Sequence, residues 1–153
     1  MSRNVKHGFQ IVALVAAIVW LSSIGASAAP TPGFGVYDID TLLMDHPLAA
    51  DQPMRTDEIK HDSLSSIHLT QIRGVIQSHR HLAHEENVWV IRGSGRLVVD
   101  GVKYKVAAGQ VIHIPKGASH SFYNMGAKPA VVISVFSPGF DGKDRVYDNP
   151  PAR

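Results

Sequence analysis

Two histidines and a glutamate, His79, His81 and Glu86, have the types and spacing best suited to chemistry in this sequence. The histidines flank Arg80 in a stretch that we expect to be extended, so both imidazoles point to one face and Arg80 to the other. Glu86 begins the next predicted strand, so its carboxylate can approach the same point within the ~2 Å bonds of a divalent ion. A further histidine from elsewhere in the chain would complete a coordination shell of three histidines and one carboxylate, with positions left open for water or substrate. Such a shell suits one divalent transition-metal ion: iron, manganese, nickel, copper or zinc.

Short β-strands separated by glycine and proline are the elements that must position these side chains. Asp100-Gly101 lies between two β-rich runs and predicts a two-residue hairpin. No long amphipathic helix follows residue 50, and turns recur at regular spacing, which indicates an all-β sandwich or small barrel. The predicted strands cover residues 67–71, 87–92, 96–99, 102–106, 111–114, 120–123 and 130–136. Before them, Asp40 to His46 predicts a short helix with Asp40 as its cap and Pro47 after its end.

The first 28 residues have the order of a secretory signal peptide. Arg3 and Lys6 precede an uninterrupted apolar run over residues 11–21, and small residues follow up to Ala28, after which we expect cleavage. An uncleaved membrane anchor is the alternative, but the run is short of the ~20 residues that a spanning helix needs. The sequence therefore predicts a periplasmic or secreted protein that contacts a membrane only through an uncleaved signal.

Composition excludes several classes of protein. The chain has no cysteine, which excludes disulfides, a lipoprotein anchor and thiolate metal ligands. Removal of residues 1–28 leaves 13 basic and 13 acidic side chains and no basic block. Nucleic acid is therefore not an expected partner. The remaining length is enough for one domain with its own core.

Two longer patterns resemble the motifs of the cupin superfamily. The first, G(X)5HXH(X)3,4E(X)6G, matches from His79 through Glu86 to Gly93, although Gly74 stands one residue too close to His79. The second, G(X)5PXG(X)2H(X)3N, matches without departure over residues 109–124. Both motifs in order are a far more specific signal than an isolated HxH.

The resemblance implies a cupin double-stranded β-helix, or jelly-roll barrel, with a short N-terminal helical or irregular extension. It implies metal ligation by His79, His81, Glu86 and His120; Glu85 is the alternative carboxylate, but only Glu86 stands six residues before Gly93. A cupin that has lost its metal is the other interpretation, but such a loss usually removes ligands. The expected divisions are a signal peptide (1–28), an N-terminal extension (29–64), the barrel core (65–137) and a C-terminal tail (138–153). The tail resembles that of small bacterial cupins. It would either fold over the barrel as a lid or, as the simpler expectation, remain a solvated segment.

Further candidates surround these ligands. His113 is the candidate catalytic or supporting group, with a purely structural histidine as the alternative. Phe122, Asn124 and Gln77 are the candidate pocket residues; alternation from His120 would aim the first two inward. Exposed apolar strand residues such as Trp89 favour a homodimer.

Fold alone does not define the reaction. We expect a metal-dependent enzyme that acts on a small organic molecule, of dioxygenase or related type, or else an isomerase or decarboxylase. The alternative is a non-catalytic periplasmic protein that binds a small ligand or a metal.

Overall fold

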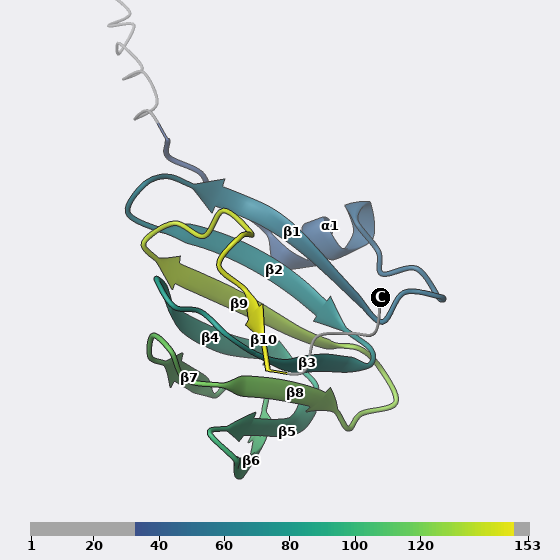
Figure 1. The fold of residues 1–153 in the computed structure, drawn as a ribbon. Helices are drawn as coiled ribbons and strands as arrows, with labels where there is room; N and C mark the ends of the chain where they lie inside the picture. The colour runs from purple at the N-terminus through teal and green to yellow at the C-terminus, as the bar shows by residue number, and fades with distance from the viewer. Residues whose placement is uncertain (1–32, 149–153) are drawn as a thin grey trace, which may run out of the picture. The chain divides into compact units, whose positions relative to one another are not determined.

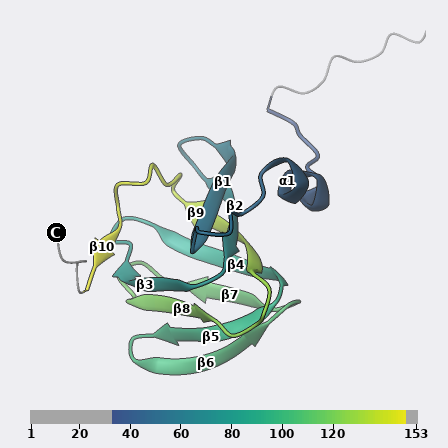
Figure 2. The same cartoon turned by 90° about the vertical axis from the view of Figure 1, so that its right-hand side faces the viewer.

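Two five-stranded antiparallel sheets account for most of residues 33–148, the part of the chain that this computed structural model describes (Figure 1). The expected all-β fold class is confirmed. The first sheet has the order β1 (Met54–His61), β2 (Ser66–Ile72), β9 (Ala130–Ser137), β4 (Glu85–Arg92) and β7 (Val111–Ile114). The second has the order β10 (Val146–Tyr147), β3 (Val75–Arg80), β8 (His120–Asn124), β5 (Ser94–Val99) and β6 (Val102–Ala107). Figure 2 shows β3, β8, β5 and β6 succeeding one another in the second sheet.

The hydrophobic core lies between the inner faces of the two sheets. Val88 and Val90 of β4 and Val132 of β9 pack in one cluster with Leu97 of β5 and Phe122 of β8. These residues alternate with more exposed ones along their strands, as expected for sheets with one buried face. Burial of this apolar area is the main force that holds the two sheets together.

The predicted hairpin at Asp100-Gly101 is present between β5 and β6. Val99 pairs with Val102 across the turn, and the two turn residues have φ values of 46° and 81°. Positive φ at both central positions is the geometry of a type I′ turn, whose twist matches that of the flanking strands.

The hydrogen bonds of the described residues do not close the strands into a barrel. They form two separate sheets, with β1 and β7 at the edges of one and β10 and β6 at the edges of the other. The expectation of a sandwich is therefore met, and that of a closed barrel is not. The edges are protected by short length in β7 and β10 and by charged side chains in β1 and β6.

Strand β1 lies within the segment, 29–64, that we expected to be an extension. It pairs along its length with β2, from Met54↔Ile72 to His61↔Ser66. The charged residues of β1 obscure the apolar alternation by which a strand is predicted from sequence. Two of them, Arg55 and Asp57, form an ion pair along the strand. The edge position explains why so polar a strand is stable.

The predicted short helix is present as α1 (Ile39–Asp45), but its cap is Asp38 and not Asp40. The side chain of Asp38 accepts a hydrogen bond from the backbone N–H of Thr41 at 2.8 Å. That bond, with a second from the Thr41 hydroxyl, holds the pKa of Asp38 below its usual value. Asp40 instead contacts Arg92.

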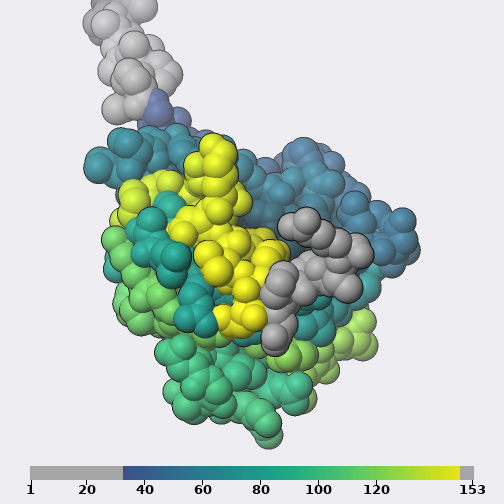
Figure 3. Space-filling view, viewed as in Figure 1, coloured from purple at the N-terminus to yellow at the C-terminus, as the bar shows by residue number. Residues whose placement is uncertain are grey.

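The segment of residues 138–148, which we call the C-terminal strap, is not the solvated tail that we expected. Phe140 is 7% exposed, and Val146 and Tyr147 pair with Arg80 and His79 of β3. In Figure 3 the yellow end of the described chain lies against the body of the domain. The predicted signal peptide lies outside the described residues. No helix between residues 33 and 148 is long and apolar enough to cross a membrane.

Candidate metal centre

A β-bulge in β3 sets the direction of His79. Ile76 pairs with Phe122 of β8, and three residues later His79 pairs with His120, so the register shifts by one residue between the two pairs. Strict alternation would turn Ile76 and His79 to opposite faces. Because of the bulge, both residues line the same internal cavity.

Three buried imidazoles, those of His79, His81 and His120, meet at this end of the second sheet. Each offers one ring nitrogen, and these nitrogens all lie within 4.8 Å of one another. The ring centroids of His79 and His120 are 4.2 Å apart. Arg80 is turned the other way and pairs with Asp148, so the expected division of the His-Arg-His segment between two faces is confirmed.

Each of these histidines is oriented by a backbone carbonyl. The Nδ1 atoms of His79, His81 and His120 lie 2.8, 2.5 and 3.0 Å from the carbonyl oxygens of Gln77, Asp144 and Ala118, respectively. A carbonyl can only accept, so Nδ1 carries the proton and the Nε2 lone pair is left for another partner. Metal-binding histidines are commonly fixed in this way.

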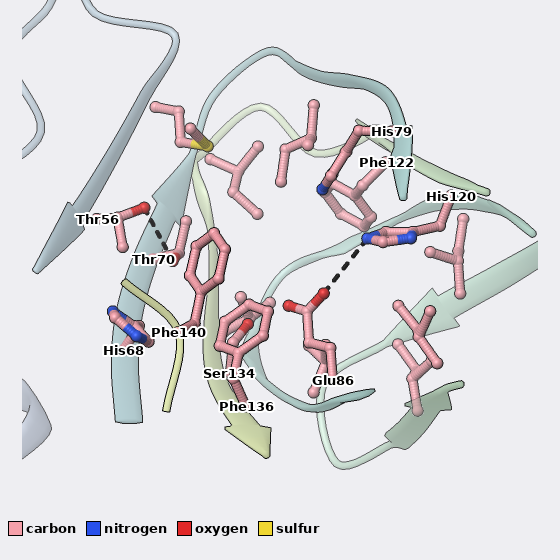
Figure 4. A pocket seen from close by; sticks show the side chains of 18 of the residues that line it. Thr56, His68, Thr70, His79, Glu86, His120, Phe122, Ser134, Phe136 and Phe140 are labelled. Carbon is pink, nitrogen blue, oxygen red and sulfur yellow. Dashed lines mark hydrogen bonds and ion pairs between the residues drawn. The ribbon is translucent and has the colours of Figure 1, made fainter. Parts of the chain in front are cut away.

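The Nε2 atoms of His81 and His120 are buried without a hydrogen-bond partner among the described residues. Glu86 Oε2 lies 3.3 Å from His120 Nε2 (Figure 4). It lies 4.0 Å from His81 Nε2. A neutral imidazole and a carboxylate would thus place lone pairs toward each other, which is unfavourable unless a cation lies between them. A metal ion bonded to both atoms at ~2 Å satisfies this arrangement.

Glu86 and not Glu85 lines the cavity. Glu86 is paired with Ile114 of β7 and Phe136 of β9, whose side chains also line the cavity, and it is 9% exposed. Glu85 precedes it on β4 and therefore points to the opposite face. The structure thus places Glu86 beside the histidines, as the motif spacing predicts.

The charge states in this cluster suit a divalent cation. Burial, and then the neighbouring His120, lowers the pKa of His79 to about 4, and burial also lowers the pKa of His81. Burial alone would raise the pKa of Glu86, but hydrogen bonds with His120 and Ser134 outweigh it and lower that pKa. The first of these needs positive charge between His120 Nε2 and the carboxylate, which a metal ion supplies as a proton does. Neutral imidazoles and an ionised carboxylate are the ligand forms that a metal requires. The three histidine donors, two of them with orphaned Nε2 atoms and with Glu86 beside those two, therefore suit one transition-metal ion.

Three of the candidate ligands, His79, Glu86 and His120, line a cavity of about 90 Å³ between the two sheets. That is several times the space one water molecule needs. Most of its wall is aliphatic or aromatic, and Figure 4 shows Phe136 and Phe140 beside Glu86. The lining residues are Met54, Thr56, His68, Thr70, Ile72, Ile76, His79, Glu86, Val88, Val90, Leu97, Ile112, Ile114, His120, Phe122, Val132, Ser134, Phe136, Phe140 and Arg145.

The C-terminal strap holds the segment that carries His81. Asp144 accepts hydrogen bonds from the backbone N–H groups of Leu82 and Ala83 at 3.0 and 2.7 Å, and it lies 2.7 Å from Nδ1 of His84. Burial opposes ionisation of Asp144, but these contacts, led by that with His84, lower its pKa to about 2. The same residue orients His81 through its backbone carbonyl.

A second acid of the strap, Asp148, fastens the strap to two strands of the second sheet. Its carboxylate accepts hydrogen bonds from Ser78 and Arg80 of β3 and from Ser119, the residue before His120. The strap thus supports the segments around all three candidate histidine ligands.

His113, the predicted catalytic or supporting residue, does not join this site. It is exposed on β7, and its Nδ1 lies 3.0 Å from the side-chain oxygen of Asn87. Asn87 follows Glu86 on β4, so the Asn87–His113 pair faces outward because Glu86 faces inward. The register between β4 and β7 therefore removes His113 from the cavity.

Of the three predicted pocket residues, only Phe122 lines the cavity. Asn124 shares the parity of Phe122, but it ends β8, and its amide donates hydrogen bonds to the carbonyls of Arg73 and Lys128. Its role is to fasten turns. The side chain of Gln77 is exposed because the bulge turns it outward, and only its carbonyl serves the site, through His79.

Among the lining residues that were not recognised in the sequence are His68, Phe140 and Arg145. His68 alternates with Thr70 and Ile72 along β2, and this shared parity is a signal that could have identified it. Phe140 and Arg145 lie in irregular parts of the strap, where no periodicity exists, so no sequence pattern indicated their position.

The family model described as "Cupin domain" matches residues 68–136, which contain all four candidate ligands. A curated relative, an uncharacterized protein of Aquifex aeolicus, is 41% identical over 68 residues, which are 44% of this chain and 55% of that protein. The chain therefore spans about half the length of this curated relative.

Solved structures show the same fold at low identity. An uncharacterized conserved protein of Klebsiella pneumoniae with a double-stranded β-helix domain has a TM-score of 0.63 at 19% identity, over 75% of this chain and 97% of that one. The nucleoside dehydratase Pac13 has a TM-score of 0.54 at 13% identity, over 62% of this chain and 78% of that one. A variant of Streptomyces Pac13 with uridine is also among the similar structures.

Proposed function

Since the chain belongs to the cupin superfamily, we propose that it is a metal-dependent enzyme acting on a small organic molecule. His79, His81, Glu86 and His120 hold one divalent transition-metal ion, and the internal cavity receives the substrate. The reaction is of dioxygenase-like or related type.

One observation carries the metal part of this proposal. Three imidazoles have their Nδ1–H groups bonded to backbone carbonyls, and two of their Nε2 atoms are buried without a partner beside the Glu86 carboxylate. Buried polar atoms without partners are rare and are commonly explained by a missing ligand. A metal ion supplies the partner for all of them at once.

The cavity supports the enzymatic part. When bound, the metal would supply Lewis-acid polarisation of a coordinated substrate or binding of dioxygen. The apolar walls exclude bulk water and position a small carbon skeleton, and Phe122, Phe136 and Phe140 limit its size. His68 is the lining residue outside the four ligands that can move a proton; burial lowers its pKa, so it is a base rather than an acid at neutral pH.

A non-catalytic ligand-binding protein is the second candidate. The position of His68 favours a binding function. Figure 4 shows His68 beyond Phe140 as seen from Glu86, away from the candidate metal ligands. A group so placed suits recognition better than catalysis. Among the described lining residues, there is also no carboxylate besides Glu86.

Metal analysis tests the first part. Protein purified without chelator should carry about one transition-metal ion per chain, and His79→Ala, His81→Ala and His120→Ala should each remove most of it. His113→Ala is the matched control, because His113 lies on the outer face. Wild-type protein that stays metal-free after addition of iron, manganese, nickel, copper and zinc would exclude the proposed centre.

Turnover separates the two candidate functions. The iron-loaded protein should consume dioxygen, or convert one member of a library of small organic molecules, and the His120→Ala variant should not. Isomerase or decarboxylase activity would appear as conversion without dioxygen uptake. Tight binding of a library member with no conversion under any metal would favour the binding protein.

Export is a separate proposal that rests on the sequence of residues 1–28 alone. The basic start, short apolar run and Ala26-Ser27-Ala28 ending support cleavage after Ala28. N-terminal sequencing of native protein should then begin at Ala29 in a periplasmic or secreted fraction. Recovery of the uncleaved chain in the membrane fraction would instead support an anchor.

A further inference from the structure

Arg145 is a positively charged residue in the wall of a largely apolar cavity. It belongs to the C-terminal strap, and it lines the cavity together with His79 and Glu86. Its guanidinium carbon lies over the ring of Phe140, 5.8 Å from the centroid, and that ring is 4.9 Å from the ring of His81. Arg145 is thus separated from a candidate metal ligand by one aromatic side chain.

The Nε atom of Arg145 is buried and has no hydrogen-bond partner within residues 33–148. The two acids that flank it in the strap are bound elsewhere, Asp144 to His84 and Asp148 to Arg80. Glu86 contacts His120 and His81 instead. Residues 1–32 and 149–153 contain no Asp or Glu. No acidic side chain within residues 33–148 forms an ion pair with Arg145, and the acids nearest to it in the strap and the cavity wall are already engaged.

The charge of the site, once a metal is bound, points to the missing partner. A divalent ion with one carboxylate and three neutral imidazoles keeps one net positive charge, and Arg145 adds a second at the same cavity. Buried charges of one sign are unfavourable unless an opposite charge compensates them. An anion bound in the cavity beside the guanidinium provides that compensation.

We infer that Arg145 binds the carboxylate of a small organic acid, whose apolar body occupies the cavity. This inference rests on the proposed metal centre and assigns its substrate class. A planar carboxylate matches the fork of a guanidinium, since two parallel N–H···O bonds can form. The aliphatic walls and the volume of about 90 Å³ suit a short chain or a single ring rather than a larger polar ligand.

The test compares acids with their neutral amides on the cobalt(II)-loaded full-length protein. Acetate, butanoate and benzoate are titrated against acetamide, butanamide and benzamide by calorimetry and by the visible spectrum of cobalt. We expect at least one acid to bind about tenfold or more tightly than its amide, and Arg145→Gln to remove that difference. Arg145→Lys should keep part of it, because the charge remains and the fork is lost.

Lys143→Gln is the matched control. It removes one positive charge from the same strap at a side chain that is 86% exposed and pairs with Asp141, so acid binding should change less than twofold. Equal binding of acids and amides by the cobalt-loaded wild type, or unchanged acid preference in Arg145→Gln, would overturn the inference. A wild type without acid preference overturns the inference even if Arg145→Gln fails to fold, and Arg145→Lys then provides the variant comparison. Elemental analysis keeps this failure distinct from failure of the metal centre, in which the wild type would hold no cobalt.

Discussion

At the scale of single residues, the backbone carbonyls of Gln77, Asp144 and Ala118 determine what the histidines can do. By accepting the Nδ1–H protons, they fix the tautomer and direct the Nε2 lone pairs toward one point. The Glu86 carboxylate then supplies negative charge at the same point. The site is preorganised for a cation because the orienting groups belong to the main chain.

Glu86→Gln should lower the affinity for the metal by more than about tenfold. The amide keeps the size of the side chain but loses the charge that offsets the ion, and inner ligands matter at least as much as the groups that orient them. Calorimetric titration of the chelator-treated protein measures this. Glu85→Gln should behave as wild type, and the reverse order of the two variants would mean that the carboxylate is wrongly assigned.

The metal-free protein should lose stability as pH falls from about 6.5 toward about 4. The folded-state pKa of His79 is about 4, below the ordinary value of about 6.5. Protonation therefore favours the unfolded state. The stability that neutral His79 contributes is fully present above the unfolded-state pKa and is lost as pH falls toward the folded-state pKa. Melting curves of chelator-treated wild type and His79→Phe test this, and the variant should show a weaker pH dependence in this window. An equal dependence in both proteins would assign the loss to other groups.

At the scale of strands and turns, close packing between β5 and β8 leaves no room beside Gly95. A Cβ atom there would lie 2.2 Å from the Phe122 ring and 2.6 Å from the backbone oxygen of Tyr123. Since β5 pairs with β8 at this position, relief requires movement of the backbone itself. The aromatic wall of the cavity is thus set by a residue without a side chain.

Gly95→Ala should reduce the free energy of unfolding by about 1–3 kcal/mol, the usual range for overpacking. Chemical denaturation gives this value. Gly74→Ala is the control, because its Cβ would meet Pro53 at an ordinary 3.4 Å and should cost little. A stable Gly95→Ala protein would show that β5 and β8 separate more easily than the register indicates.

Asp144→Ala should release the C-terminal strap from the 82–84 segment. Loss of three contacts to a partly exposed carboxylate should cost about 1–2 kcal/mol. The metal affinity should also fall, because the freed strap no longer holds the carbonyl of residue 144 against Nδ1 of His81. Asp141→Ala is the matched control, since that carboxylate contacts only Lys143 in the same strap. Metal affinity equal to wild type in Asp144→Ala would mean that the strap does not support the site.

The elements also explain what the sequence could and could not indicate. The motif spacing predicted the ligand cluster because turns of defined length join the strands that carry it. His113 lies outside the cavity because its direction depends on the register between β4 and β7, which no local pattern encodes. The side chain of Gln77 lies outside the cavity for a related reason, the bulge in β3. The strap contacts of Asp144 link residues about 60 positions apart and have no periodic signal.

At the scale of the whole domain, the outer face of the first sheet has apolar side chains that the fold does not cover. Trp89 and Val111 are paired across β4 and β7 and are 41% and 59% exposed. Ile91 shares the parity of Trp89 on β4. An exposed apolar patch on a flat sheet favours self-association about a twofold axis.

We therefore expect a homodimer formed through this outer face of β4 and β7. Light scattering of the wild type at micromolar concentration should give twice the chain mass, and Trp89→Glu should give a monomer, because two carboxylates would meet near the axis without counter-ions. Tyr104→Glu is the control: Tyr104 is a similarly exposed aromatic residue, 49%, on β6 of the other sheet. Because Asn87 and His113 flank the patch on the side away from the cavity, the metal content of the monomeric variant should equal that of wild type. A monomeric wild type would remove the dimer, and a dimer that survives Trp89→Glu but not Tyr104→Glu would move its interface to the second sheet.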